Sequence, residues 1–485
     1  MDPILIMALV AGYFILLIGI SYLSGRSDSN EAFFLGNRQS PWYVVAFGMV
    51  GASLSGVTFI SVPGWVADSQ FSYMQVVLGY VVGYAVIIKV LLPLYYRLQL
   101  TSIYTYLQQR FGERSYLTGS VFFLISRVIG AAFRLYLVAI VLQYAIFDAL
   151  EVPFWLTVMI TIVLIWVYTF RSGIKTIIWT DTLQTTFMLL AVVISVIIIK
   201  REIFPEMGLI EYVARSDKSK IFFWDNWRGS QHFWKSFLSG IFITIVMTGL
   251  DQDMMQKNLS CRNLTDAQKN MFWLSLTLVV VNLVFLSLGV LLYDYADLMG
   301  ITESGDKLYP AVALSGDLGL AVSIFFVIGL IAAAYSSADS ALTALTTSFS
   351  VDILKVDRMA AEKSKRVRKL THLGFSLVLL IVIVLFRYTI EESVIKELFV
   401  AAGYTYGPLL GLFAFGLFTS YEVRDRWVPL VALISPVLCY ILKDNSVAWL
   451  NYTFGFELLL VNGLLTYFGL WILRKPAGNK KAAVD

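Results

Sequence analysis

Long apolar stretches recur along this chain from its first residues to nearly its last. A helix needs about 20 mostly apolar residues to cross the hydrocarbon core of a bilayer. Only 14% of the residues are charged, whereas a soluble domain carries about 25%. Because lipid offers the backbone no hydrogen bonds, such stretches span a membrane as helices. The sequence therefore predicts an all-α integral membrane protein embedded in a lipid bilayer.

We expect about thirteen membrane-spanning helices. The first stretch is too long for the apolar core of a signal peptide and no basic segment precedes it, so we interpret it as a retained helix. The expected helices are Pro3–Leu23, Pro41–Val66, Ser72–Tyr96, Tyr116–Phe147, Phe154–Phe170, Thr176–Ile199, Phe237–Gln256, Met271–Leu292, Leu318–Phe349, Leu373–Phe386, Leu398–Phe418, Val428–Leu442 and Phe456–Leu473.

Lysine and arginine residues gather in alternate connections between these stretches, and such residues mark the cytoplasmic side. The connections 68–72 and 148–152 contain neither residue. The long loop 200–236 contains several, but long translocated loops weaken the rule. We therefore expect the N-terminus outside and the C-terminus in the cytoplasm. The cytoplasmic set is Arg26, Arg38, Arg97, Arg110, Arg114, Arg171, Lys175, Lys257, Arg262, Lys269, Lys355, Arg358, Lys363, Lys365, Arg366, Arg368, Lys369, Arg424, Arg426, Arg474, Lys475, Lys480 and Lys481.

The sequence carries no motif typical of an enzyme. It contains no HExxH, GxSxG or GxxxxGK[ST] pattern. Its two cysteines and two histidines are too few for a disulfide framework or a histidine metal site. It also lacks a soluble receptor or nucleotide-binding module. We expect no catalytic residues, no cofactor and no nucleic-acid partner.

The second stretch contains a run of small and polar residues, Gly51-Ala52-Ser53-Leu54-Ser55-Gly56-Val57-Thr58, followed by Pro63-Gly64. Two glycines at mid-span favour a local break in the helix. Carbonyl groups freed by such a break would face a cavity, as they do in the broken helices of transporters. The alternative is a face of small residues on which another helix packs closely.

Oxygen-bearing side chains also cluster in the ninth stretch, at Ser336, Ser337, Asp339 and Ser340. Hydroxyl, carbonyl and carboxylate oxygens suit a hard cation such as Na⁺, although isolated serines more often bond to their own helix. Asp181 in the sixth stretch is an ion ligand, a proton carrier or the partner of a nearby arginine. The sequence leaves these alternatives open.

Arg127 and Arg134 lie seven residues apart in the fourth stretch and so share one helix face. The fork of an arginine suits a carboxylate, either of a ligand or of a neighbouring acid. Thr244, Thr248 and Asp251 lie at helical spacing in the seventh stretch. They are substrate contacts, or they mark the cytoplasmic end of that helix.

Four of these motifs together resemble the sodium:solute symporter family. They are Ser53-Leu54-Ser55-Gly56, Trp179-Thr180-Asp181-Thr182-Leu183-Gln184, Ser336-Ser337-Ala338-Asp339-Ser340 and Tyr404-Thr405-Tyr406-Gly407-Pro408-Leu409-Leu410-Gly411. The run Leu92–Leu98, with Leu100-Thr101-Ser102 and Tyr106-Leu107, is similar to the branch that contains iodide, multivitamin, monocarboxylate and sialic acid carriers.

The resemblance implies the LeuT-type fold, in which two five-helix inverted repeats surround a midplane site. The repeats would cover residues 41–199 and 237–420. An extra helix and loop (1–40) would precede them, and two C-terminal helices (427–473) would follow. Residues 1–473 would thus form a single transmembrane domain, with a short cytoplasmic tail at 474–485.

The resemblance also implies sodium sites. The common site would use the carbonyls of Gly51, Leu54 and Ala333 and the hydroxyls of Ser336 and Ser337. A second site, present in some members, would use Asp181, Ser336, Asp339 and Ser340. Na⁺ is the only metal expected.

For the substrate, the resemblance favours an organic anion, such as sialic acid or another carboxylate. The stretch Trp273–Leu292 lacks the lysine of sugar carriers, and Thr244 stands where they have an asparagine. An arginine packed against Asp181 or Asp251 would argue against the anion. The expected substrate-binding residues are Ser53, Ser55, Thr58, Gln75, Arg127, Arg134, Thr244 and Thr248.

We therefore expect a secondary active transporter that couples Na⁺ entry to the uptake of a small organic solute, in the cell (inner) membrane and functional as a monomer. The alternatives are a sodium-coupled sugar or inositol symporter and a proton-coupled carrier that uses Asp181. Outside transport, the alternative is a solute-binding channel or sensor, although the sequence shows no filter motif and no signalling domain.

Overall fold

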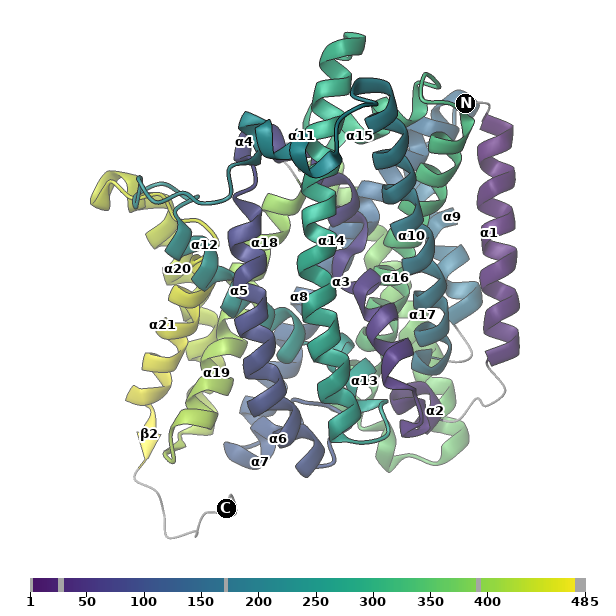
Figure 1. The fold of residues 1–485 in the computed structure, drawn as a ribbon. Helices are drawn as coiled ribbons and strands as arrows, with labels where there is room; N and C mark the ends of the chain where they lie inside the picture. The colour runs from purple at the N-terminus through teal and green to yellow at the C-terminus, as the bar shows by residue number, and fades with distance from the viewer. Residues whose placement is uncertain (1–2, 25–29, 170–172, 390–393, 476–485) are drawn as a thin grey trace.

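The computed structural model describes residues 3–24, 30–169, 173–389 and 394–475, and most of them lie in helices that run between two opposite faces (Figure 1). Within these ranges the strands are two residues long, β1 (Glu422–Val423) and β2 (Arg474–Lys475), and they pair antiparallel. The predicted all-α architecture is confirmed. Phe170, Arg26, Arg171, Lys480, Lys481 and the tail from residue 476 lie outside the described residues.

The helices that form the body of the protein are α1 (Pro3–Ser24), α3 (Trp42–Gly64), α5 (Tyr73–Val86), α6 (Leu92–Arg97), α8 (Glu113–Leu142), α9 (Phe154–Thr169), α10 (Gly173–Ile203), α12 (Phe233–Thr244), α13 (Gln252–Leu259), α14 (Leu264–Met299), α16 (Leu320–Ser348), α17 (Ala361–Phe386), α18 (Val394–Thr405), α19 (Gly407–Phe418), α20 (Val428–Leu450) and α21 (Leu458–Ile472). Shorter helices lie in the connections, namely α2 (Asn30–Leu35), α4 (Val66–Ser69), α7 (Thr105–Arg110), α11 (Leu209–Arg215) and α15 (Leu308–Leu314).

Each of the thirteen predicted stretches corresponds to one of these helices or to two consecutive ones. Among the described residues, eight helices are long and apolar enough to cross a membrane, and two bent helix pairs raise that number to ten. The apolar runs in α1, α9 and α21 are shorter, at 10–17 residues. The count of thirteen spans therefore stays a prediction.

Several helices extend well beyond the apolar stretch that predicted them. The stretch Met271–Leu292 is the middle of α14, which begins at Leu264 and ends at Met299. Asn263 caps its start by accepting a hydrogen bond from the Asp266 N–H at 2.9 Å, and Gly300 ends it with a φ of 69°. The added turns are polar, so a search for apolar stretches cannot detect them.

Three spans are broken rather than continuous. In α3 the backbone leaves the helical conformation at Ser55, where φ is 44° and ψ is 171°. The span built from α12 and α13 bends by 63° at Leu250–Asp251, and the span built from α18 and α19 bends by 44°. The break expected between Gly51 and Thr58 is therefore present.

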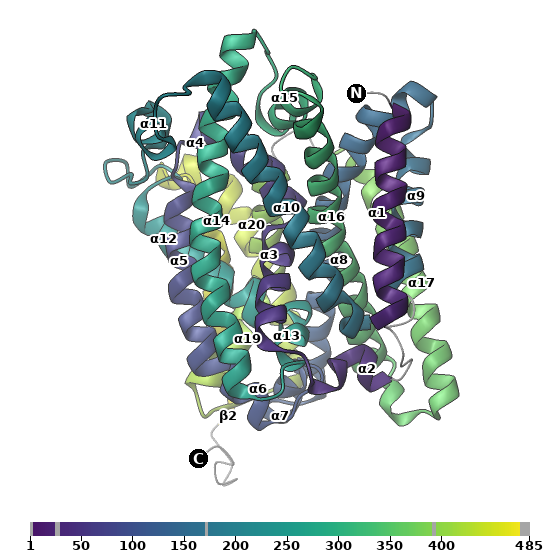
Figure 2. The same cartoon turned by 45° about the vertical axis from the view of Figure 1, so that its right-hand side comes forward.

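The broken helix α3 lies at the centre of the bundle, in contact with α10, α14 and α16 (Figure 2). In its spanning segment 89% of the residues are buried, compared with 22% in the segment containing α20, which lies at the periphery. A Cβ atom on Gly51 would lie 2.2 Å from Thr185 Oγ1 of α10. The small residues of α3 thus serve both expected purposes, since they allow close packing as well as a break.

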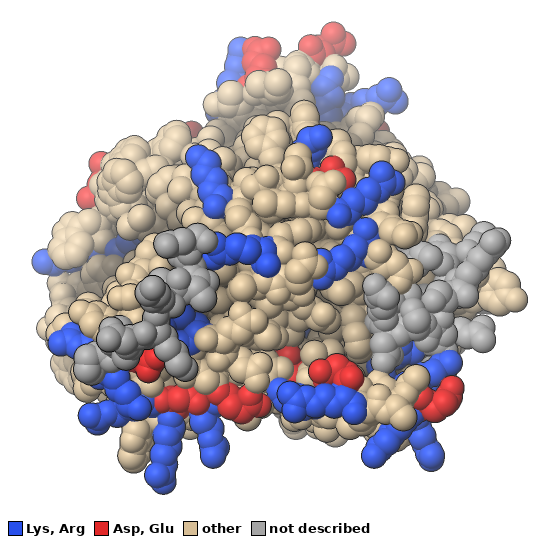
Figure 3. Space-filling view, turned by 90° about the horizontal axis from the view of Figure 1, so that it is seen from below, with Lys and Arg blue, Asp and Glu red and all other residues tan. Residues whose placement is uncertain are grey.

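The two faces of the bundle differ in the elements that they carry. The lower face in Figure 1 holds α6, α7 and β2, whereas the upper face holds the start of α1 and the region of α11. Lysine and arginine side chains are spread over the lower face (Figure 3). This arrangement agrees with the predicted cytoplasmic set, and the orientation of the chain in the membrane remains a prediction.

The helices α5 and α12 cross with their backbones in direct contact. A Cβ on Gly79 would lie 2.2 Å from the carbonyl oxygen of Phe237, and a Cβ on Gly240 would lie 2.1 Å from that of Val76. Because the obstructing atoms belong to the backbone, no side-chain rotation could relieve either overlap.

We therefore predict that Gly79→Val lowers the melting temperature of the purified protein substantially, since overpacking of this kind costs about 1–3 kcal/mol or more. Gly12→Val is the matched control, because nothing lies within 4 Å of a Cβ at that exposed glycine of α1. Equal melting temperatures of the two variants, measured by scanning fluorimetry, would contradict the close crossing.

Candidate functional site

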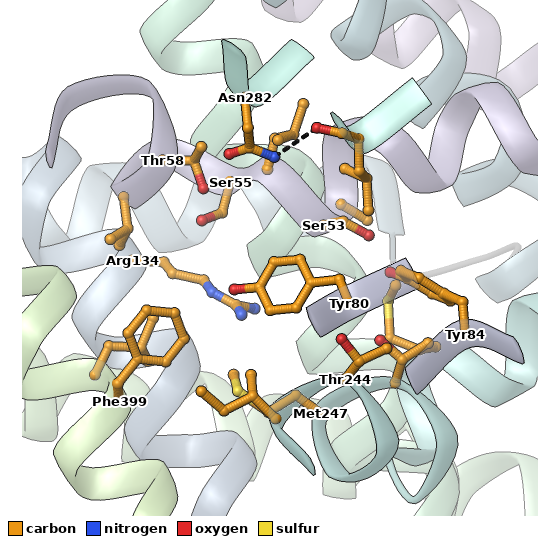
Figure 4. A pocket seen from close by; sticks show the side chains of 18 of the residues that line it. Ser53, Ser55, Thr58, Tyr80, Tyr84, Arg134, Thr244, Met247, Asn282 and Phe399 are labelled. Carbon is orange, nitrogen blue, oxygen red and sulfur yellow. Dashed lines mark hydrogen bonds between the residues drawn. The ribbon is translucent and has the colours of Figure 1, made fainter. Parts of the chain in front are cut away.

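A cavity of about 90 Å³ lies where the break in α3 faces α5, α8, α12 and α14 (Figure 4). Its wall combines hydroxyl groups and aromatic rings with two arginines and one amide. The residues that carry these groups are Ser53, Ser55, Thr58, Tyr73, Tyr80, Tyr84, Arg127, Arg134, Thr244, Thr248, Asn282 and Phe399. A cavity with an apolar body and few polar groups is typical of a site for a small organic molecule.

Arg134 extends from α8 into this cavity, and its guanidinium points toward Tyr80 (Figure 4). The residue is 7% exposed, and its Nε and Nη1 atoms are buried without a hydrogen-bond partner. No ion pair links Arg134 to any carboxylate in the part of the chain that the structure describes. A buried charge of this kind is costly unless it is paired, so the cavity is suited to an entering anion.

Arg127 lies two helical turns before Arg134 on the same face of α8, and its guanidinium is already paired with carboxylates. Its guanidinium forms an ion pair with Asp253 of α13, and its Nη1 lies 3.8 Å from Asp251 Oδ2. Tyr406, at the break between α18 and α19, donates a hydrogen bond to the same Asp251 oxygen at 2.5 Å. This cluster joins three spans. Arg127 is therefore packed against Asp251, which is the contact expected to argue against an organic anion as the substrate. An anion site in this cavity would have to use Arg134 instead.

Seven of the eight expected substrate-binding residues line the cavity, namely Ser53, Ser55, Thr58, Arg127, Arg134, Thr244 and Thr248. Gln75 does not. It is buried and bonds to backbone groups: its amide donates to the carbonyl of Gln231 at 2.9 Å, and its Oε1 accepts from the N–H of Phe223 at 3.2 Å. Through these two hydrogen bonds Gln75 links α5 to the loop that precedes α12.

The aromatic and amide groups of the cavity were not expected from the sequence. Tyr73, Tyr80 and Tyr84 lie on one face of α5 at helical spacing, a pattern that also occurs in ordinary packed cores. Asn282 donates to the Leu278 carbonyl at 2.8 Å, while its Oδ1 is buried without a partner. A lone amide inside the apolar stretch Met271–Leu292 was the signal available in the sequence.

The residues expected to form the common sodium site meet where α3 crosses α16. Ser337 Oγ lies 3.5 Å from the carbonyl oxygens of both Ala52 and Ala333. Gly51 and Leu54, whose carbonyls were expected as ligands, flank this position in α3, and the Gly51 N–H donates to Thr185 Oγ1 at 3.0 Å. The Ser336 hydroxyl donates a hydrogen bond to Asp181 Oδ1 at 2.7 Å. Its lone pairs therefore point away from Asp181 and can bind a cation.

The residues expected to form a second sodium site are buried, but Asp181 has a cationic partner within the protein. Lys257 Nζ of α13 lies 2.6 Å from Asp181 Oδ2, and both side chains are 1% exposed. Asp339 and Ser340 are buried one turn beyond Ser336 in α16. Lys257, which was expected among the cytoplasmic basic residues, thus has its ammonium buried in an ion pair inside the bundle.

Comparison with known proteins identifies the relatives of this chain. The model of the sodium:solute symporter family matches residues 33–422. The chain belongs to this family. It is 25% identical over 475 residues to the sodium/sialic acid symporter NanT of Aliivibrio fischeri, covering 93% of this chain and 90% of that protein. It is 26% identical over 430 residues to the sodium-coupled monocarboxylate transporter 1 of Xenopus laevis, covering 82% and 65%.

The solved structure of a Na⁺-coupled sialic acid symporter in a substrate-bound outward-open state has the same fold. Its TM-score is 0.82 at 19% identity, and the match covers 97% of this chain and 99% of that one. The family and the LeuT-type fold inferred from the four motifs are thus confirmed. Members of the family are sodium-coupled transporters, so the chain is a transporter rather than an enzyme.

We predict that Ser336→Ala and Ser337→Ala each lower the apparent affinity for Na⁺ by roughly tenfold or more, because a contact to a charged partner is worth about 1.5–3 kcal/mol. Na⁺-dependent thermal stabilisation of the purified variants measures this effect without a known substrate. Ser376→Ala is the control, since that buried hydroxyl bonds to the carbonyl of His372 in its own helix. Unchanged Na⁺ dependence in both Ser336→Ala and Ser337→Ala would refute the site.

Proposed function

We propose that this protein couples Na⁺ entry to the uptake of a small organic anion that carries a carboxylate. The observation that supports the proposal most directly is that one break in α3 contributes to both sites. Ala52 lines the cavity, and its carbonyl faces Ser337 at the α3–α16 crossing. A cation bound at this crossing would fix the backbone that forms one wall of the cavity, which links ion binding to substrate binding.

Arg134 supports an anion rather than a neutral sugar. Its buried guanidinium presents unpaired donors to the cavity, and an arginine fork binds a carboxylate through two parallel hydrogen bonds. A neutral sugar would leave this charge without a counter-charge. The hydroxyls of Ser53, Ser55 and Thr58 lie across the cavity from Arg134 and would bind the polar groups of the same ligand.

The size of the cavity favours a compact carboxylate. One buried water needs at least about 10–15 Å³ of cavity volume. A cavity of about 90 Å³ therefore has room for roughly six to nine non-hydrogen atoms of about the size of a water molecule. The relatives named above transport sialic acid and monocarboxylates, and a molecule of monocarboxylate size fits this space without a change in the wall. Sialic acid would require the cavity to widen.

In the mechanism that we propose, Na⁺ enters from outside and joins α3 to α16 at the common site. This favours the outward-open state, in which the anion binds to Arg134 beside the break. Closure followed by exposure to the cytoplasm then releases both. Na⁺ influences the affinity for the anion only insofar as it binds the two conformations unequally. We also propose an N-terminus outside, a cytoplasmic C-terminus and a functional monomer.

The test is uptake into proteoliposomes under an inward Na⁺ gradient, with labelled pyruvate, lactate, sialic acid, myo-inositol and glucose. We expect accumulation of a carboxylate and its loss when Na⁺ is replaced by K⁺. Accumulation of glucose or inositol alone would overturn the choice of an anion. Uptake driven by a pH gradient without Na⁺ would favour the proton-coupled alternative, and equilibration without accumulation would indicate a channel.

We predict that Arg134→Met raises the KM for the transported anion at least tenfold, a loss of about 1.4 kcal/mol or more, because the carboxylate would lose its counter-charge. Arg134→Lys keeps the charge without the fork and should give an intermediate KM. Arg387→Met is the control, since this exposed arginine lies over the Phe154 ring at 4.7 Å, away from the cavity. A KM unchanged in Arg134→Met would contradict its role.

A further inference from the structure

The buried ion pair of Lys257 and Asp181 occupies the place where the family resemblance implied a second sodium ion. Asp181 is one of the two acids of that expected site, the other being the buried Asp339. Neither oxygen of Asp181 is vacant. Oδ2 accepts from the Lys257 ammonium at 2.6 Å, and Oδ1 accepts from the Ser336 hydroxyl at 2.7 Å. Both members of the pair are 1% exposed, so water cannot take the place of either partner.

A sodium ion at Asp181 would have to share this carboxylate with an ammonium group. Two like charges held a few ångströms apart repel each other strongly when burial removes the screening by water and salt. Displacing Lys257 instead would leave its ammonium buried without a counter-charge, which costs several kcal/mol. The helix α13 holds the lysine in place, since Lys257 lies in its last turn among residues that are all buried.

We infer that the Lys257 ammonium takes the place of the second sodium ion, so that this protein binds a single Na⁺, at Ser336 and Ser337. The inference rests on the proposed function and specifies its ion stoichiometry. In this arrangement Asp181 serves as a positioning residue for the remaining sodium. It accepts a hydrogen bond from the Ser336 hydroxyl, so the lone pairs of that hydroxyl point away from Asp181.

The consequence for transport is a change in the charge moved in each cycle. Lys257 is part of the chain and returns with it, so its charge is not transferred across the membrane. One Na⁺ together with one monovalent carboxylate carries no net charge. Each transferred charge couples to the membrane potential with about 2.3 kcal/mol per 100 mV, so the accumulation of such an anion would depend on the Na⁺ gradient and not on the potential.

Equilibrium binding of ²²Na⁺ to the purified full-length protein in nanodiscs tests the inference without an organic substrate. We expect one Na⁺ per chain in the wild type and two in Lys257→Met, where Asp181 is released, with a return to one in the double variant Lys257→Met/Asp181→Asn. Lys257→Arg keeps the charge and should bind one. Lys235→Met, which removes a buried lysine 3.8 Å from Glu457, is the matched control and should also bind one.

Two Na⁺ per chain in the wild type would overturn the inference and leave the proposed function intact. One Na⁺ in a folded Lys257→Met would also overturn it, because the released carboxylate would then be no sodium site. If Lys257→Met does not fold, the number of Na⁺ ions bound per chain by the wild type and by Lys257→Arg still tests the inference. Absence of any Na⁺ binding to the wild type would instead remove the common sodium site, and with it the proposed function.

Discussion

The structure depends on one constraint, namely that polar backbone groups at membrane depth must be bonded or must face a ligand. The helix α3 leaves its regular conformation at Ser55 in the most completely buried span of the bundle. Neighbouring helices approach it closely enough to surround the break, and the glycines of α3 make that approach possible. The cavity and the proposed sodium site are therefore two sides of one opening in the backbone.

Three buried cations, Arg127, Arg134 and Lys257, lie on the helices that surround this opening or contact them. Arg127 is neutralised by Asp253 and Asp251, and Lys257 by Asp181, whereas Arg134 has no such partner in the described part of the chain. Of these three cations, two form ion pairs between helices, and the third, Arg134, is the one proposed to bind the substrate. The distinction follows from the neighbouring spans and not from the residue type, because Arg127 and Arg134 lie on the same face of the same helix.

The sequence could predict the features that depend on one segment of the chain, but not the contacts between distant helices. Length and apolarity located every long helix, and the run Gly51–Thr58 located the break, because both depend on properties of one segment. The motif around Ser336 indicated the α3–α16 crossing through a family resemblance. The partners of Asp181 and Arg127 could not be predicted, since each pair joins helices far apart in the chain. Gln75 matched a substrate residue by position, but its amide bonds to a loop backbone that the sequence does not place.

The close crossing of α5 and α12 has a mechanical consequence for the transport cycle. Two helices whose backbones touch at Gly79 and Gly240 cannot slide past each other or separate without breaking that contact, which favours their movement as one unit. The span of α12 and α13 nevertheless changes direction by 63° just beyond that contact. The bend of this span lies at Leu250–Asp251, where Tyr406 and Arg127 both contact Asp251. The part of the cavity wall formed by α5 and α12 is therefore built as a single packed unit.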